Sequence, residues 1–296
     1  MHILLFGKNG QLGWELQRAL APLGKLTALS HDSKDYCGDF LNPDGLIETI
    51  RALKPDIIVN AAGYTAVDLA ETKQDIAMRI NAESVEVLAK EANKLGSLLV
   101  HYSTDYVFDG SGIQAWNELD NPSPVNFYGK TKLSGEQAVQ KYCDRYLIFR
   151  SSWIYSTYGD NFIKTILNIG LDREIISVVN DQYGAPTGAD LLADCSAHAI
   201  KVVLDDESKC GLYHVAASGV TSWYEYALFI FDFSNKQNKK IKVKEVIEVP
   251  SASFFREAMR PMNSRLSTEK FQCEFNLVLP EWRRGVERML TELMAK

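Results

Sequence analysis

The sequence lacks the features of a secreted, membrane-spanning or nucleic-acid-binding protein. Its five cysteines are odd in number and widely spaced, and without a Cys-x-x-Cys pair they indicate neither a disulfide framework nor a zinc site. No apolar run approaches the roughly 18 residues that span a bilayer. A net charge of −6 provides no basic surface for nucleic acid. We therefore expect a cytoplasmic protein in a reducing compartment, with neither nucleic acid nor membrane as a partner.

The chain does have the composition of a large folded protein. Its 296 residues, 46% of them hydrophobic and 24% charged, can bury one large core or two modest ones. Short apolar runs alternate with helical patterns, and the runs lie at residues 3–6, 26–29, 56–60, 98–102 and 146–149. This alternation predicts an α/β fold with a Rossmann-type doubly wound parallel sheet. In such folds ligands bind at the carboxyl ends of the strands.

A glycine-rich turn follows the first apolar run. Gly7, Gly10 and Gly13 have the spacing G-x-x-G-x-x-G, and apolar residues at helical spacing begin at Leu12. Glycines permit a tight turn and let backbone N–H groups approach a pyrophosphate at the positive end of a helix. We interpret the segment as a dinucleotide-binding turn. The alternative is an ordinary strand-to-helix turn that happens to contain glycines.

Tyr128 and Lys132 stand four residues apart, so on a helix their side chains share one face. A phenol alone has a pKa of about 10, and a neighbouring ammonium lowers that pKa. The pair is therefore a candidate acid–base device, although on this motif alone an exposed helix face is the more frequent explanation of the spacing. Residues 61–63 and 103–105 end two other predicted strands at the same sheet edge, and this convergence favours a functional role.

Several longer stretches together resemble the extended short-chain dehydrogenase/reductase superfamily, and within it the reductases of dTDP-linked 4-dehydro sugars. They are residues 6–13, 103–110, 128–132, 181–187, 260–261 and 263–266. The resemblance implies a dinucleotide-binding domain over residues 1–150, to which segments around 175–205 return. It implies a smaller C-terminal domain over residues 151–296, mainly for the sugar nucleotide. The implied reaction is hydride transfer from NADPH or NADH to the C4 ketone of dTDP-4-dehydro-L-rhamnose, giving dTDP-L-rhamnose.

The same resemblance implies roles for individual residues. Tyr128 would be the proton donor, Lys132 would hold the nicotinamide ribose and lower the tyrosine pKa, and Thr104 would bond in the same centre. Thr104, Asp105 and Trp153 would bind the substrate, the last two at its deoxysugar. The implied cofactor-binding residues are Gly7, Gly10, Gln11, Leu12, Gly13, Ser30, Asp39, Phe40, Gly63, Tyr64, Thr65, Tyr102, Tyr128 and Lys132.

Two alternatives remain beside the reductase. One is an epimerase or another sugar-nucleotide enzyme of the superfamily, which stoichiometric consumption of NAD(P)H distinguishes. Dehydratases of the superfamily have Thr-Asp-Glu where this chain has Thr104-Asp105-Tyr106, which favours ketone reduction over dehydration. The other is a non-catalytic regulatory subunit, which could lose Tyr128, Lys132 and Thr104 freely, whereas all three are present.

The resemblance also suggests a metal-bridged homodimer. Glu15, Asp190 and Glu292 lie on three separate predicted helices, at positions where related reductases hold Mg²⁺ between subunits. Asp190 is one methylene shorter than the glutamate that is usual there, and Mg²⁺ requires close octahedral geometry. The alternative is three solvated carboxylates.

Cofactor choice depends on the end of the second predicted strand. An acidic side chain there repels the 2′-phosphate of NADP, and relatives can carry aspartate where this chain has Ser30. His31 and Lys8 would favour the phosphate, whereas Asp32 would oppose it. We predict that both cofactors are used and that NADPH is preferred.

Overall fold

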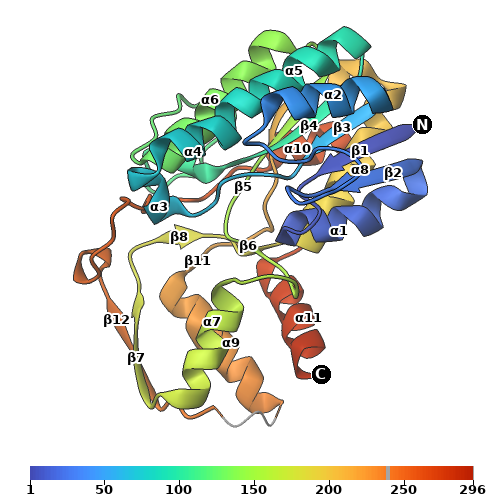
Figure 1. Cartoon of the computed structure of the whole chain (residues 1–296). Coiled ribbons are helices and arrows are strands. Elements are labelled where there is room, and N and C mark those ends of the chain that lie inside the picture. Colours follow the sequence, from blue (N-terminus) through green and yellow to red (C-terminus); the bar gives the residue numbers. More distant parts are fainter. Residues whose placement is uncertain (238–240, 296) are drawn as a thin grey trace.

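The computed structural model describes residues 1–237 and 241–295. A six-stranded sheet forms its upper part (Figure 1), with the strand order β10-β5-β4-β3-β1-β2 and every neighbouring pair parallel. The strands are β1 (His2–Phe6), β2 (Lys25–Leu29), β3 (Ile57–Asn60), β4 (Leu98–Thr104), β5 (Tyr146–Ser151) and β10 (Gly211–His214). The predicted parallel α/β sheet is confirmed.

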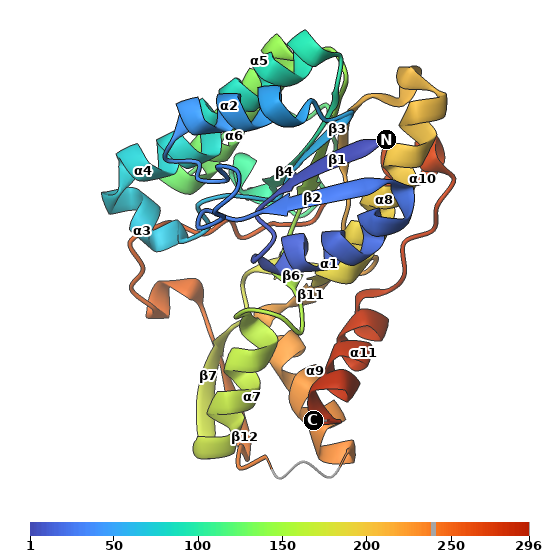
Figure 2. The ribbon, with the colours of Figure 1, turned by 45° about the vertical axis from the view of Figure 1, so that its right-hand side comes forward.

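Helices cover both faces of this sheet (Figure 2). One face packs against α1 (Gln11–Leu20), α8 (Ala189–Asp205) and α10 (Glu269–Phe275), and the other against α2 (Pro43–Leu53), α5 (Ser84–Leu95) and α6 (Phe127–Tyr142). Successive residues of β1 point to opposite faces. Ile3 and Leu5 therefore pack with the first set of helices and Leu4 and Phe6 with the second. Because all four are fully buried, the strand reads as a continuous apolar run.

Shorter elements extend the second face near the ends of β3 and β4. They are α3 (Val67–Thr72), α4 (Gln74–Met78), a π-helical turn (Arg79–Glu83) that leads into α5, and a 3₁₀ turn (Asp105–Val107) after β4. Three further 3₁₀ turns are Ala21–Leu23, Glu207–Lys209 and Ser251–Ser253. Within the part of the chain that the structure describes, no helix is long and apolar enough to span a bilayer.

A smaller layer lies below the sheet (Figure 1). It contains the parallel pair β7 (Ile175–Val179) and β12 (Glu245–Val249), with α7 (Phe162–Asp172), α9 (Trp223–Lys236) and α11 (Trp282–Met294). Two short pairs join it to the sheet: β6 (Ile154–Tyr155) with β9 (Thr187–Gly188), and β8 (Tyr183–Gly184) with β11 (Thr221–Ser222). Its core is a separate cluster that includes Ile163, Tyr226 and Trp282.

Both halves of the chain build the sheet layer. Leu192 of α8, Tyr213 of β10 and Phe271 of α10 share one core with Ile3 of β1. The order of strands reverses between β1 and β3, because the chain places β2 on one side of β1 and then continues on the other. Such a switch point is where doubly wound sheets bind ligands, and the glycine-rich turn after β1 lies there.

Candidate active site

Steric limits at the turn after β1 show why its glycines are needed. Gly7 has φ +87°, and a Cβ there would lie 2.6 Å from the carbonyl carbon of Ala61. A Cβ at Gly13 would lie 2.0 Å from the carbonyl oxygen of Gly7. Gly10 provides no side-chain cap for α1, so N–H groups of the first turn remain available to an anion. This cradle fits the pyrophosphate of a dinucleotide.

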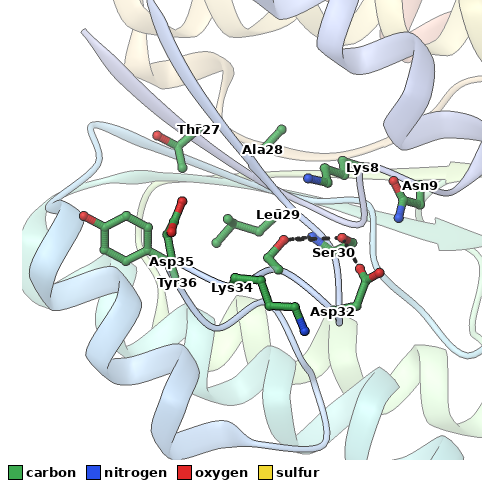
Figure 3. A pocket seen from close by; sticks show the side chains of 11 residues that line it. Lys8, Asn9, Thr27, Ala28, Leu29, Ser30, Asp32, Lys34, Asp35 and Tyr36 are labelled. Carbon is green, nitrogen blue, oxygen red and sulfur yellow. Dashed lines mark hydrogen bonds between the residues drawn. The ribbon is translucent and has the colours of Figure 1, made fainter.

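A cavity of about 590 Å³ opens beside this turn, at the carboxyl end of β2 (Figure 3). Lys8, Ser30, Asp32 and Lys34 are among its lining residues, whereas His31 is not. The buried Ser30 hydroxyl donates a hydrogen bond to Asp32 Oδ1 at 2.6 Å. This bond lowers the pKa of the Asp32 carboxyl. Asp35 also lines this cavity, so two carboxylates and two ammonium groups face it.

The catalytic pair predicted from the sequence lies on α6. Asn126 caps this helix by accepting a hydrogen bond from Gly129 N–H at 2.8 Å. A Cβ at Gly129 would lie 2.1 Å from the carbonyl oxygen of Tyr106, so glycine permits α6 to pack closely on the turn after β4. Lys132 is buried, whereas Tyr128 keeps part of its surface exposed.

The surroundings of Tyr128 keep its phenol protonated. Loss of water raises its pKa, the Asp105 carboxylate raises it further, and the Thr104 hydroxyl and Arg260 lower it only in part. The Lys132 ammonium donates to the carbonyl oxygen of Tyr102 at 2.6 Å, and burial lowers the Lys132 pKa to about 8. The neutral phenol is the form that a proton donor needs. The expected lowering of the Tyr128 pKa by Lys132 stays a prediction.

Thr104 and Asp105 lie where β4 ends. The Thr104 hydroxyl donates to Asp105 Oδ1 at 3.0 Å and accepts from Tyr106 N–H at 3.2 Å. Asp105 is 2% exposed, and burial raises the pKa of its carboxyl to about 6. Its second oxygen, Oδ2, has no hydrogen-bond partner among the described residues. A buried acceptor without a partner is costly unless a ligand supplies the donor.

More buried hydroxyls that have no partner among the described residues lie at the same edge. They belong to Ser103 at the end of β4 and to Ser151 and Ser152 at the end of β5. The register pairs Thr104 with Ser151, so the two strand ends lie side by side. Trp153 follows two residues later with φ +50°, a region that bulky residues rarely adopt. The edge therefore combines unsatisfied polar atoms with a strained backbone, as functional sites often do.

The remaining predicted cofactor residues lie around this edge. Asp39 accepts from Leu41 N–H at 2.9 Å, and Phe40 packs against Phe6 with ring centroids 5.5 Å apart. The buried Tyr102 phenol donates to Ser196 on α8 at 2.8 Å. Gln11 accepts from Asn161 at 3.0 Å. The predicted residues Leu12, Gly63, Tyr64 and Thr65 follow the carboxyl ends of β1 and β3.

Asn81 was not predicted from the sequence. Its side chain accepts from Tyr64 N–H at 2.8 Å and donates to the Tyr64 carbonyl at 3.0 Å and to Thr131 Oγ1 at 3.0 Å. It thus connects the loop after β3 to the helix that carries Tyr128 and Lys132. It lies in the π-helical turn, a rare geometry that often marks functional sites. The one signal in the sequence is an asparagine at a position where the helical pattern predicts a buried, apolar residue.

Arg260 was recognised in a motif but not linked to the catalytic tyrosine. It donates to Asp68 of α3 at 2.6 Å, and its guanidinium lies 5.9 Å from the centroid of the Tyr106 ring. Its Nη1 is buried without a partner in the described part of the chain. Asn126, the cap of α6, donates to the neighbouring Met259 carbonyl at 2.7 Å. The segment before Arg260 is therefore tied to the catalytic helix.

A buried ion pair joins α6 to β5. Arg150 donates to Glu136 through Nε at 2.9 Å and through Nη2 at 2.6 Å. Both side chains are at most 4% exposed. Glu136 lies one helical turn after Lys132. The two parallel hydrogen bonds therefore hold β5 against the helix that carries the catalytic pair.

The candidate metal ligands surround one small cavity of about 150 Å³ between α1, α8 and α11. Arg288 lies 3.3 Å from Asp190 and 3.2 Å from Glu292, and Arg18 lies 3.5 Å from Glu15. Over residues 1–237 and 241–295, no group of three acidic, histidine or cysteine residues has a metal-binding arrangement. Each of the three carboxylates is paired with an arginine, so within one chain these residues do not form a metal site by themselves.

Comparisons with known proteins agree with this geometry. The family described as RmlD substrate binding domain matches residues 1–295. The dTDP-4-dehydrorhamnose reductase of Escherichia coli K12 is 56% identical over 293 residues, 99% of this chain and 98% of that protein. The Clostridium acetobutylicum reductase structure has a TM-score of 0.89 at 33% identity, covering 99% of this chain and all of that one. The Bacillus anthracis reductase, in complex with NADP, has a TM-score of 0.87 at 35% identity, covering 98% and 99%. The chain therefore belongs to the dTDP-4-dehydrorhamnose reductase family.

Proposed function

We propose that this protein reduces the C4 ketone of dTDP-4-dehydro-L-rhamnose with NADPH or NADH and gives dTDP-L-rhamnose. The observation that carries the proposal is the placement of Tyr128, Thr104 and Lys132 at one sheet edge beside a glycine cradle. The relative with 56% identity bears the name of this reductase, and a related structure contains NADP.

The proposed roles follow from the chemistry of the side chains. When bound, the nicotinamide cofactor supplies the hydride. Tyr128 gives its phenolic proton to the oxygen at C4, where negative charge develops. Thr104, which lowers the pKa of the phenol, makes that proton easier to release. Lys132 holds the nicotinamide ribose and stabilises the resulting phenolate.

Asp105 and Trp153 are proposed to hold the deoxysugar. The free Oδ2 of Asp105 is a buried acceptor suited to a sugar hydroxyl. The Trp153 indole, two residues beyond the end of β5, offers an apolar surface, and aromatic rings are common contacts for ligands in pockets.

The cofactor is proposed to lie along residues 1–150, with segments around 175–205 returning to that domain, and the sugar nucleotide mainly against residues 151–296. Helix α8 supports the first part, because it packs on the same core as β1. Lys8 and Lys34 at the cavity after β2 support binding of a 2′-phosphate. We therefore propose that both cofactors are used and that NADPH is preferred, although Asp32 opposes the phosphate.

Location and assembly are further proposals. A cytoplasmic location is supported by the five cysteines, none of which forms a disulfide in the structure described. A homodimer bridged by Mg²⁺ rests on the resemblance of Glu15, Asp190 and Glu292 alone. Light scattering with and without EDTA tests it, and an unchanged mass argues against a metal-bridged dimer.

The proposed function is tested by turnover of dTDP-4-dehydro-L-rhamnose while nicotinamide absorbance is followed. Stoichiometric loss of NADPH is expected, whereas turnover without loss would indicate an epimerase, and no turnover a non-catalytic subunit. Tyr128→Phe should lower kcat by about 10²- to 10⁴-fold, the usual contribution of a general acid. Tyr142→Phe, at the far end of the same helix, is the matched control. A near wild-type kcat in Tyr128→Phe would remove the phenol from the mechanism.

A further inference from the structure

Trp153 is held in an unfavourable backbone conformation. Its φ of +50° makes it one of three residues other than glycine with positive φ in the described chain. A bulky residue adopts this region only when surrounding contacts impose it. The residue lies between β5 and β6, and its carbonyl oxygen accepts from Thr187 N–H at 3.2 Å. The contacts of the Trp153 indole are therefore the place to find what imposes this backbone conformation.

Two neighbours confine the Trp153 indole. The ring of Trp223 stacks on it with centroids 3.6 Å apart and planes 13° apart. At Gly184 of β8, an added Cβ would lie 2.8 Å from Trp153 Cε2 and 3.1 Å from its Nε1. The indole thus packs against the Trp223 ring, and a side chain at position 184 would collide with it.

Trp223 is itself fixed by polar contacts. It is the first residue of α9, whose N-cap Ser222 forms a capping box with Glu225. Its indole Nε1 donates to Gln182 Oε1 at 3.1 Å, and Gln182 Nε2 donates to Ser251 Oγ at 2.9 Å. Ser251 begins the 3₁₀ turn Ser251–Ser253, so Gln182 links the Trp223 ring to a second segment of the chain.

We propose that Trp223 is a positioning residue for the sugar of the substrate, acting through Trp153. The stack holds the indole of a residue with a strained backbone, two residues beyond the end of β5. The inference rests on the proposed contact between Trp153 and the deoxysugar. A purely structural reading would make Trp223 a member of the aromatic cluster with Phe162, whose centroid is 4.5 Å away. That reading predicts a loss of stability without a selective change in substrate binding.

The test compares Trp223→Ala with Trp223→Phe in the full-length protein. Trp223→Ala should raise KM for dTDP-4-dehydro-L-rhamnose by about ten-fold, the upper range for an aromatic pair, with KM for NADPH unchanged. Trp223→Phe keeps a stacked ring and should restore most of the affinity. Loss of the exciton couplet of the paired indoles in circular dichroism reports the stack independently of activity. An unchanged substrate KM in Trp223→Ala would overturn the proposal.

A double-mutant cycle with Trp153→Ala separates the possible failures. If Trp223 acts through Trp153, Trp223→Ala should have little further effect on KM once Trp153 is alanine, whereas additive effects would refute the positioning role. If Trp153→Ala leaves KM unchanged, the proposed contact between Trp153 and the sugar is wrong, and the positioning role of Trp223 is therefore wrong as well. If Trp153→Ala raises KM and Trp223→Ala does not, the sugar contact stands and only the role of Trp223 is wrong.

Two more variants guard against general loss of folding. Phe229→Leu, on the same helix, loosens a contact with Trp282 whose centroid is 5.1 Å away, and it should lower stability without raising substrate KM. Gly184→Ala leaves Trp223 intact but pushes a methyl group against the Trp153 indole, so it should raise substrate KM as Trp223→Ala does. An unchanged KM in Gly184→Ala would show that the position of the indole does not matter.

Discussion

Replacing Asp105 with asparagine should stabilise the protein at neutral pH, although the residue lies in the proposed substrate site. Asp105 is 2% exposed, and its Oδ2 has no partner in the structure described. Burial raises the pKa of the carboxyl from 3.8 to about 6, and the nearby hydroxyls of Ser264 and Thr104 lower it only in part. Of these two hydroxyls, only that of Thr104 has normal hydrogen-bond geometry, and it donates to Oδ1. The ionised carboxylate therefore destabilises the folded state.

The magnitude and sign follow from proton linkage. A rise of about two pKa units corresponds to about 3 kcal/mol of unfavourable free energy once Asp105 is ionised. The folded protein binds this proton more tightly than the unfolded chain, so the contribution of Asp105 is most favourable below pH 3.8 and is lost as pH rises to about 6. Asparagine does not ionise, so its advantage should grow through that window. The amide N–H groups of the new asparagine have no acceptor when buried, so they will cancel part of the gain in unfolding free energy.

Urea unfolding of ligand-free wild type and Asp105→Asn across this pH window measures the effect. Asp109→Asn is the matched control, because this exposed carboxylate accepts from Ser111 N–H at 2.7 Å and its pKa is lowered. Its replacement should slightly destabilise the protein at neutral pH and less so at low pH, the opposite sign. A difference in unfolding free energy between Asp105→Asn and wild type that does not depend on pH would refute the reasoning. The same variant should raise KM for the sugar nucleotide.

Three further changes test other parts of the site. Glu136→Gln leaves the buried Arg150 charge without its partner, so the free energy of unfolding in urea should fall by about 3–5 kcal/mol; a loss below about 1 kcal/mol would contradict a buried ion pair. Ser30→Asp should move the ratio of kcat/KM for NADPH and NADH toward NADH by about ten-fold; an unmoved ratio means that Ser30 does not face the ribose. Lys132→Met should lower kcat and raise KM for the cofactor together, and a change in only one of them would separate its two proposed roles.

The sheet and its ligand-binding edge were predictable because their physical requirements are local. β1 lies between two helical layers, so each of its inner residues must be apolar, and the strand appears as an uninterrupted run. Gly7 and Gly13 are needed because any Cβ would collide with backbone atoms. Requirements of this kind produce patterns that can be recognised within a few residues of sequence.

Contacts between distant segments were not predictable in the same way. Asn81 meets Thr131 across fifty residues, and Trp223 meets Trp153 across seventy, with no local pattern that links them. The arginine pairs at the small cavity between α1, α8 and α11 include one local contact that the sequence predicts and one distant contact that it does not. Arg288 with Glu292 has the i,i+4 spacing that a sequence reveals. Arg288 with Asp190 depends on how α8 and α11 pack.

The unsatisfied groups of this protein are not spread evenly. Among the described residues, nine buried polar side-chain atoms have no partner, and five of them, at Ser103, Asp105, Ser151, Ser152 and Arg260, lie around the ends of β4 and β5; the other four belong to His101, Arg145, Tyr226 and Trp282. Each is destabilising unless a ligand completes it, and Trp153 adds backbone strain at the same edge. The fully buried strands beneath, such as β3 and β4, supply the stability that keeps these groups in place. A site that is destabilised by its own burial binds a polar ligand without reorganising, and this is why the same Asp105→Asn change should stabilise the fold and weaken substrate binding.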